Sequence, residues 1–275
     1  MRQRGILAWL CVITVVVCVF VTLHVQTTID EVRDDQYRQA GAIATLIGRT
    51  CVDYDYLQSV SVRVVSPAGS GSGVLYSRDG RTFCWTAGHV VAKYDGGVHD
   101  DVVVEQEIRV NGIYQDTRKI KAKVIAYSEA DERQDLAILE LEEYVDVTTV
   151  FAANQVYMPG TPVVHVGSMS GLYNSVTIGI VSQTDRDLLE NGIMFDQTCV
   201  IAYPGSSGGG TYLMNGQCMG IHVRGGKVGM GFIVPVRRMW DWAEKFDLMW
   251  AMDPSVPMPK EIAVVMDEPV HRETE

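Results

Sequence analysis

The chain has 275 residues, of which 47% are hydrophobic. This is enough to bury the core of one domain of about 200 residues and leave sequence over. The 34 acidic and 23 basic residues give a formal net charge of -11. No cluster of lysine and arginine stands out, so we expect no nucleic-acid partner.

An apolar stretch without charge follows the N-terminus. A helix over residues 5–23, GILAWLCVITVVVCVFVTL, is long enough to cross a hydrocarbon core of about 30 Å. Arg2 and Arg4 precede it and acidic residues follow, so the positive-inside rule places residues 1–4 in the cytoplasm. We therefore predict a transmembrane anchor over residues 5–24, with the lipid bilayer as its partner. A cleaved signal peptide is the alternative.

Beyond the anchor, Thr28 and Glu31 have the spacing of a capping box, which predicts a helical stalk over residues 25–50. From Val60 onward, short β-rich runs alternate with turns, and this pattern indicates an all-β sandwich or barrel. The expected strands are 59–65, 71–77, 82–91, 101–110, 121–128, 135–141, 162–168, 176–183, 217–223 and 229–236.

The C-terminal part of the chain changes character again. An amphipathic pattern after Pro235 predicts a closing helix, which leaves a folded domain over residues 51–250. Residues 251–275 contain four prolines and mixed charge, so we expect a disordered tail.

Six cysteines are present, two in the anchor (Cys11 and Cys18) and four beyond it (Cys51, Cys84, Cys199 and Cys218). Four cysteines in an oxidising compartment permit three disulfide patterns, and the sequence selects none of them. Buried free thiols are the other interpretation. None are paired at the spacing of metal ligands, so we expect neither a metal nor a cofactor.

Two motifs supply a base and a group to orient it, which a hydroxyl nucleophile requires. His89 lies in the apolar segment 84–91, CWTAGHVV, where small neighbours leave the imidazole room to face a cleft. Asp135 begins the apolar run 135–141, where a buried carboxylate can bond to a histidine ring nitrogen. Taken alone, an aspartate in this position is more often a solvated residue at a strand end.

The loop 204–210, PGSSGGG, is the third motif and the strongest. Its glycines allow a tight bend, so the backbone N–H groups of Gly205 and Ser207 can converge as an oxyanion hole. The apolar flanks disfavour a flexible linker. The loop also satisfies the G-x-S-x-G elbow of α/β-hydrolases, but that fold places its acid and histidine after the serine. The order His89, Asp135, Ser207 is that of chymotrypsin.

Residues from about 60 to 250 resemble the trypsin-like peptidases, and the segments TAGHVV, QDLAIL, PGSSGG and GMGFIVP resemble the HtrA/Deg branch in particular. The resemblance implies an all-β, chymotrypsin-like double β-barrel over residues 51–250, here with an N-terminal transmembrane helix and a C-terminal helix. It implies His89 as general base and acid, Asp135 as its orienting group and Ser207 as nucleophile. The Gly205 and Ser207 amides are the implied oxyanion donors.

The chain also departs from its relatives at two places. Ser206 stands where trypsin has an activating aspartate, so zymogen activation through a freed N-terminus is not implied. The residues after 250 are too few for the PDZ domain of most HtrA proteins, so we do not expect regulation of that kind.

The segment 219–226, MGIHVRGG, matches the wall of the specificity pocket in chymotrypsin-like enzymes. It resembles glutamyl endopeptidases and picornavirus-type proteases, where a histidine contacts a Glu or Gln side chain. His222 therefore predicts cleavage after Glu or Gln. Ala202, where those families have a hydroxyl, favours the alternative of a pocket for a medium apolar side chain. The expected substrate-binding residues are Ile201, Ala202, His222, Val223, Arg224 and Gly225.

These patterns together predict a membrane-anchored serine endopeptidase that acts on protein or peptide substrates through an acyl-enzyme, with its peptidase domain outside the cytoplasm. One alternative is a protease-fold binding module that has lost catalysis. Another is a viral or phage polyprotein-processing protease held at a membrane. A third, favoured by the HtrA-like motifs, is a protein-quality-control peptidase that faces the periplasm or an equivalent space.

Overall fold

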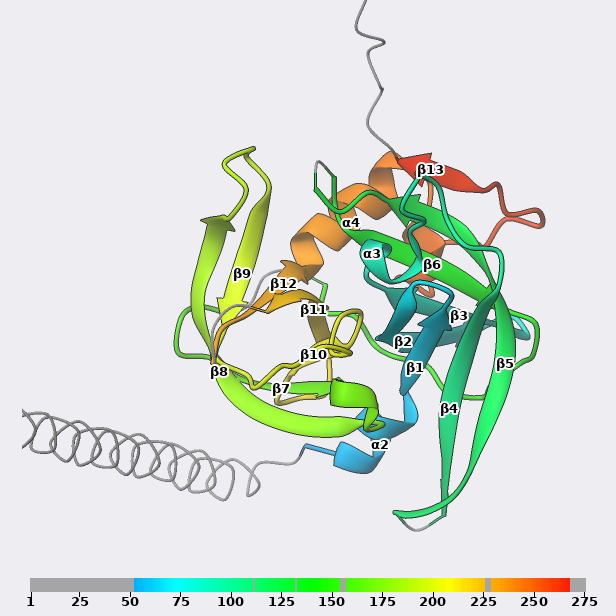
Figure 1. Ribbon diagram of the computed structural model, residues 1–275, viewed down its shortest axis with the longest axis horizontal. Coiled ribbons are helices and arrows are strands. Elements are labelled where there is room, and N and C mark those ends of the chain that lie inside the picture. Colours follow the sequence, from blue (N-terminus) through cyan, green and yellow to red (C-terminus); the bar gives the residue numbers. More distant parts are fainter. Residues whose placement is uncertain (1–51, 111, 132, 154–156, 226–228, 268–275) are drawn as a thin grey trace, which may run out of the picture. The chain divides into compact units, whose positions relative to one another are not determined.

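The computed structural model describes residues 52–110, 112–131, 133–153, 157–225 and 229–267 (Figure 1), all within the unit Thr50–Glu275. The predicted cytoplasmic N-terminus (1–4), anchor (5–24) and stalk (25–50) lie outside the described residues. In the described part of the chain, no helix has the length and apolar character needed to cross a membrane.

The first barrel consists of β1 (Ser61–Ser66), β2 (Gly69–Arg78), β3 (Arg81–Thr86), β4 (Val102–Val110), β5 (Ile113–Ser128) and β6 (Leu136–Leu141). Neighbouring strands are antiparallel in the order β5-β4-β1-β2-β3-β6, and a further pairing of β6 with β5 closes the barrel. Large apolar side chains fill its interior, which is why the alternating pattern of these segments predicted strands. They include Val64, Leu75, Phe83, Trp85, Ile120 and Ile138, all fully buried.

The second barrel consists of β7 (Pro162–Gly167), β8 (Ser175–Asp187), β9 (Met194–Thr198), β10 (Gly210–Leu213), β11 (Cys218–Gly225) and β12 (Gly231–Pro235). It closes in the order β10-β11-β12-β9-β8-β7, with β10 paired to β7. Two barrels of six strands confirm the predicted chymotrypsin-like fold. The short helices are α2 (Tyr54–Ser59), α3 (Gly88–Val91), η1 (Met169–Gly171) and η2 (Met249–Ala251), and α4 (Val236–Lys245) confirms the predicted closing helix.

Two strands of the second barrel, β9 and β10, were not predicted. β9 has the sequence MFDQT, and its Asp196 is fully buried. A buried aspartate interrupts the apolar pattern by which a strand is predicted. In the structure, Arg237 donates to Asp196 Oδ2 at 2.8 Å, and the Tyr157 hydroxyl donates to the same oxygen at 2.8 Å. The partners come from distant parts of the chain, so this strand is stabilised by contacts that local sequence does not display.

Residues 88–91 are helical, although their sequence predicted the end of a strand. The first residue of this helix, Gly88, packs closely on a neighbouring strand. A Cβ there would lie 2.4 Å from the Ser128 carbonyl oxygen, so only glycine fits against β5 at this point. Strand β3 ends at Thr86, and the His89 side chain on the helix that follows remains partly exposed.

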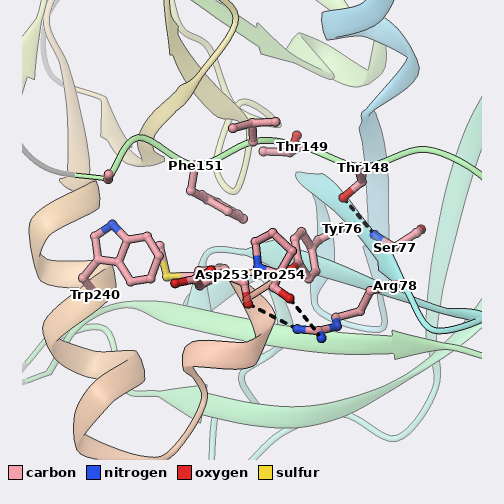
Figure 2. A pocket seen from close by; sticks show the side chains of 12 residues that line it. Tyr76, Ser77, Arg78, Thr148, Thr149, Phe151, Trp240, Asp253 and Pro254 are labelled. Atoms are coloured by element: carbon pink, nitrogen blue, oxygen red, sulfur yellow. Dashed lines mark hydrogen bonds between the residues drawn. The ribbon is translucent and has the colours of Figure 1, made fainter. Parts of the chain in front are cut away.

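The C-terminal segment packs on the first barrel, which corrects the prediction of a disordered tail for residues 251–267. Arg78 donates to the carbonyl oxygens of Trp250 and Val256, each at 2.9 Å. Figure 2 shows the same guanidinium reaching the carbonyls of Asp253 and Pro254. Because Arg78 binds backbone carbonyls of this segment, the side chains of the segment give no pattern from which the contact could be predicted.

The end of the described chain forms one more strand. β13 (Val265–Asp267) adds to the first barrel in parallel with β5, with Val265 opposite Ala126 (Figure 1). The remaining part of the predicted tail, residues 268–275, lies outside the described residues.

Cys84, Cys199 and Cys218 are free thiols, and Cys51 lies outside the described residues. None of the possible disulfide patterns is therefore formed among the described cysteines. Burial raises the pKa of Cys218 to about 12 and that of Cys84 still further above its ordinary value. Both behave as small apolar core residues rather than nucleophiles.

Candidate active site

His89 and Asp135 form a two-point contact within the first barrel. His89 Nδ1 lies 3.1 Å from each carboxylate oxygen of Asp135, and the His89 backbone N–H donates to Oδ1 at 3.0 Å. The Asp135 side chain is 1% exposed and that of His89 is 39% exposed, so the carboxylate is buried beneath a ring that remains accessible. This geometry orients the ring and holds its proton on Nδ1, which leaves Nε2 free to accept a proton.

The pKa of His89 reflects two opposing effects. Burial disfavours the charged imidazolium and lowers the pKa, whereas the hydrogen bond and the negative charge of Asp135 raise it. The carboxylate outweighs burial, and the pKa of His89 lies above its ordinary value of about 6.5. The imidazole is therefore a stronger base than a free histidine.

The loop that carries Asp135 is held at several points. Asp135 has a φ of 54°, a left-handed conformation that aspartate tolerates better than most residues. Its backbone N–H donates to the Glu129 carbonyl at 3.0 Å. The Gln134 N–H donates to Ser128 Oγ at 2.9 Å, and Ser128 Oγ donates in turn to Asp267 Oδ2 at 3.0 Å. Strand β13 thus stabilises the loop that carries Asp135, through Asp267 and Ser128.

Ser207 lies in the turn before β10, on the second barrel, close to the helix that carries His89. A Cβ at Gly71 would lie 2.5 Å from Val90 Cγ2 and 2.6 Å from the Ser207 carbonyl oxygen. The helix that carries His89 and the turn that carries Ser207 therefore both contact β2 at this point. The Ser207 hydroxyl is 3.5 Å from the Val223 carbonyl oxygen and donates to it. Among the described residues, Ser207 Oγ makes no hydrogen bond to His89.

The turn around Ser207 leaves two amides unoccupied. Gly205 has a φ of 99°, and a Cβ there would lie 2.4 Å from the Ser168 carbonyl oxygen, so the position requires glycine. The Gly208 N–H donates to the His222 carbonyl at 2.7 Å. By contrast, the N–H groups of Gly205 and Ser207 donate to no partner within the described residues. Both amides are therefore available to an oxyanion.

A cavity of about 360 Å³ opens beside Ser207. Of the predicted substrate-binding residues, Ile201, Ala202, His222 and Gly225 line it, and so do Tyr203, Pro204 and Gly229, which were not predicted. Tyr203 directly precedes the loop 204–210 and Pro204 begins it, and this position was the only sequence evidence for their role.

Two of the predicted substrate-binding residues, Val223 and Arg224, are not among the residues that line this cavity. Val223 offers its carbonyl to the Ser207 hydroxyl. Arg224 donates to the Ala130 carbonyl at 2.7 Å and lies 3.3 Å from Asp131 Oδ1, so it ties β11 to the loop before Asp135.

His222 belongs to a pair of buried histidines. Its ring centroid is 5.0 Å from that of His165, whose Nδ1 lies 3.1 Å from the Gly210 carbonyl oxygen. Burial lowers the pKa of His165 to about 4, and burial together with the neighbouring histidines lowers the pKa of His222 well below its ordinary value. The pocket wall therefore presents a neutral imidazole at pH 7. His165 was missed because its segment, PVVHVGS, reads as a plain apolar strand.

A second cavity, of about 280 Å³, lies between the first barrel and the C-terminal segment (Figure 2). Three aromatic residues, Tyr76, Phe151 and Trp240, are among the residues that line it. It contains none of the predicted catalytic or substrate-binding residues. The chemistry is therefore expected at the first cavity.

Two closed barrels, a His–Asp pair on one and a glycine-bordered serine turn on the other define a chymotrypsin-like serine peptidase domain. Residues 71–221 match the trypsin-like peptidase domain family, and the chain belongs to this family.

Its curated relatives are named as probable periplasmic serine endoproteases of the DegP-like kind. The protein from Hahella chejuensis is 35% identical over 174 residues, which cover 61% of this chain and 33% of the relative. The protein from Pseudomonas fulva is 34% identical over 182 residues, which cover 64% and 34%. The chain thus spans about a third of the length of these relatives.

Solved structures agree with the fold. A serine endoprotease from Yersinia pestis is 25% identical, with a TM-score of 0.54, over 71% of this chain and 66% of that one. An HtrA-type protease, AlgW, with a bound decapeptide has a TM-score of 0.56 at 22% identity, over 70% and 67%. The predicted resemblance to trypsin-like peptidases of the HtrA/Deg branch is confirmed.

Proposed function

We propose that the chain is an active serine endopeptidase that cleaves protein or peptide substrates through an acyl-enzyme. The observation that carries this proposal is the contact of 3.1 Å between His89 Nδ1 and both oxygens of buried Asp135. A buried carboxylate that contacts an accessible imidazole in this way is what a catalytic histidine needs to act as a base. The two N–H groups of the Ser207 turn that have no partner within the described residues support it further, because they can bind the oxyanion.

The mechanism follows from these positions. Ser207 Oγ exchanges its hydrogen bond to Val223 for one to His89 Nε2 and attacks the substrate carbonyl as the imidazole takes its proton. The oxyanion binds the N–H groups of Gly205 and Ser207. His89 then returns the proton to the leaving amine, and water releases the acyl group by the same route.

Covalent labelling tests this function. The wild-type chain should react with a fluorophosphonate probe and cleave an unfolded protein substrate. Ser207→Ala should abolish labelling and lower kcat by about 10³- to 10⁶-fold with little change in KM. Ser206→Ala is the matched control and should retain labelling, because Ser206 Oγ accepts from the Tyr203 N–H rather than facing substrate. An unlabelled wild-type chain would instead favour the inactive binding module.

For specificity, we propose that the pocket prefers glutamine before the scissile bond, ahead of glutamate. His222 lines the cavity, is only 2% exposed, and its Nδ1 has no partner within the described residues. A neutral imidazole can exchange one hydrogen bond with an amide. A glutamate carboxylate would lose its water without gaining a positive partner, which costs more than burying an amide.

His222→Ala separates this proposal from an apolar pocket. We expect the ratio of cleavage rates after Gln and after Val to fall by about tenfold, the value of roughly one hydrogen bond. A peptide library read by mass spectrometry measures the ratio directly. Arg224→Ala is the control and should leave the ratio unchanged, since Arg224 is tied to Ala130 and Asp131. If His222→Ala also leaves the ratio unchanged, the apolar interpretation is correct.

We further propose that the peptidase domain faces a space outside the cytoplasm and is held there by residues 5–24. The periplasmic names of the relatives and the charge asymmetry around the apolar stretch support this placement. Added protease should digest the domain in spheroplasts or sealed right-side-out vesicles, and alkaline washing should leave it in the membrane. Protection from the protease or release by the wash would contradict this topology.

A further inference from the structure

Ser72, on β2 of the first barrel, makes three hydrogen bonds to the other side of the active site. Its backbone N–H donates to the Ser207 carbonyl at 2.6 Å. Its Oγ donates to the Gly205 carbonyl at 2.6 Å and accepts from the Ser168 N–H at 2.7 Å. Ser72 is fully buried, so water does not replace these bonds.

We infer that Ser72 is a positioning residue for the oxyanion hole, an inference that rests on the proposed function. The Gly205 carbonyl belongs to the peptide unit between the two amides that would receive the oxyanion. Glycine imposes little backbone preference, so this unit keeps its orientation only if something outside the turn holds it. The Ser72 hydroxyl does so by binding the carbonyl oxygen.

A second route leads from the same hydroxyl to the other peptide unit. Ser72 Oγ accepts from the Ser168 N–H, and two residues further the Ser170 N–H donates to the Pro204 carbonyl at 2.7 Å. The Pro204 carbonyl and the Gly205 N–H share one rigid peptide plane. Holding the carbonyl therefore aims the N–H, and the hydroxyl of Ser72 is common to both routes.

The site demands a group that donates and accepts at once. A serine hydroxyl does both, whereas alanine does neither. Without the hydroxyl, the Gly205 carbonyl and the Ser168 N–H would both be buried without these partners, and the turn would be free to rotate toward other ones. The Gly205 amide would then point at the oxyanion for only part of the time.

Ser72→Ala in the full chain tests the inference. We expect kcat to fall by about 10- to 100-fold, less than the loss of an oxyanion donor itself, with KM changed by less than about twofold. Affinity for a peptide boronate, which mimics the tetrahedral state, should fall by a similar factor. The acid limb of the pH profile should stay in place, because Ser72 does not touch the His89–Asp135 pair. A variant that only damages the fold would not lower kcat and boronate affinity while leaving KM and the acid limb unchanged.

Ser70→Ala is the matched control. Ser70 lies two residues away on the same strand, and its hydroxyl accepts from Arg63 at 3.2 Å. We expect its kcat and boronate affinity to equal those of the wild type. Unchanged kcat and boronate affinity in Ser72→Ala would overturn the inference while leaving the proposed function intact. A wild-type chain without turnover that depends on Ser207 would overturn both.

A folding defect is distinguished by a second variant. If Ser72→Ala loses its cooperative unfolding transition, Ser72→Cys is used in its place. A thiol has the connectivity of the hydroxymethyl group but is a weak donor and acceptor. A several-fold loss of kcat with an unmoved acid limb supports the inference. A kcat equal to that of the wild type overturns it.

Discussion

His89 in the first barrel and the pair His165 and His222 in the second lie in opposite electrostatic environments. His89 contacts the carboxylate of Asp135, and its pKa is raised above the ordinary value. His165 and His222 are buried without a carboxylate, and their pKa values are lowered, that of His165 to about 4. Burial acts in the same direction on all three rings. One paired negative charge decides which histidine is a base and which stays neutral.

This difference divides the work between the barrels. A ring with a raised pKa takes a proton readily, which suits the removal of a proton from Ser207. A ring that stays neutral can recognise an uncharged side chain through one hydrogen bond, which suits the wall of a pocket. In the proposed mechanism, the first barrel supplies the base and the second supplies substrate recognition and the oxyanion amides.

Asp135→Asn is expected to have the largest effect on this comparison, because it removes the carboxylate that outweighs burial at His89. We expect kcat to fall by about 10⁴-fold, since the amide no longer favours the productive tautomer. Activity requires neutral His89, so kcat/KM declines as pH falls through its pKa. Without the carboxylate that pKa falls, and the acid limb should move to lower pH. A pH profile of kcat/KM measures both changes.

Asp131→Asn is the control for this experiment. Asp131 also raises the pKa of His89, but it ranks last among the contributions and the side chain is 80% exposed. We expect near wild-type turnover and an acid limb that moves slightly in the same direction. An acid limb that stays in place in Asp135→Asn would show that the carboxylate does not govern the imidazole.

His165→Leu gives the smaller effect, on stability rather than turnover. The pKa of His165 is about 4 in the folded chain, against about 6.5 when unfolded, so the unfolded state binds more protons between these values. Stability from this group is therefore complete above pH 6.5 and is lost as pH falls toward 4, by about 3 kcal/mol in all. The variant should lack this loss.

Urea denaturation at pH 7 and pH 4.5, compared between wild type and His165→Leu, measures the difference. Groups that titrate in this range and do not interact with His165 contribute equally to both proteins and cancel, whereas His222 loses the lowering of its pKa that His165 causes but keeps the lowering by burial. If the two proteins lose the same stability between the two pH values, His165 is not the neutral buried ring that its environment indicates.

The sequence predicted the parts of this protein whose evidence is local. Strand alternation indicated an all-β fold because side chains on a strand point to opposite faces whatever the strand pairs with. β9 was not predicted because its buried Asp196 is paired with Arg237, which lies 41 positions away. The segment after Trp250 escaped because Arg78 binds its backbone carbonyls.

The same division holds within the site. By itself, the sequence determined the chemical kinds of residue available and their order, His89, Asp135 and Ser207, because each lies in a motif of adjacent residues. Only the tertiary structure decided that Ser72 holds the Gly205 carbonyl, across 133 positions of chain, and that the His165 ring lies beside that of His222. Periodicity tells which side chains face inward, but the partner that each one meets there depends on how the two barrels close and dock.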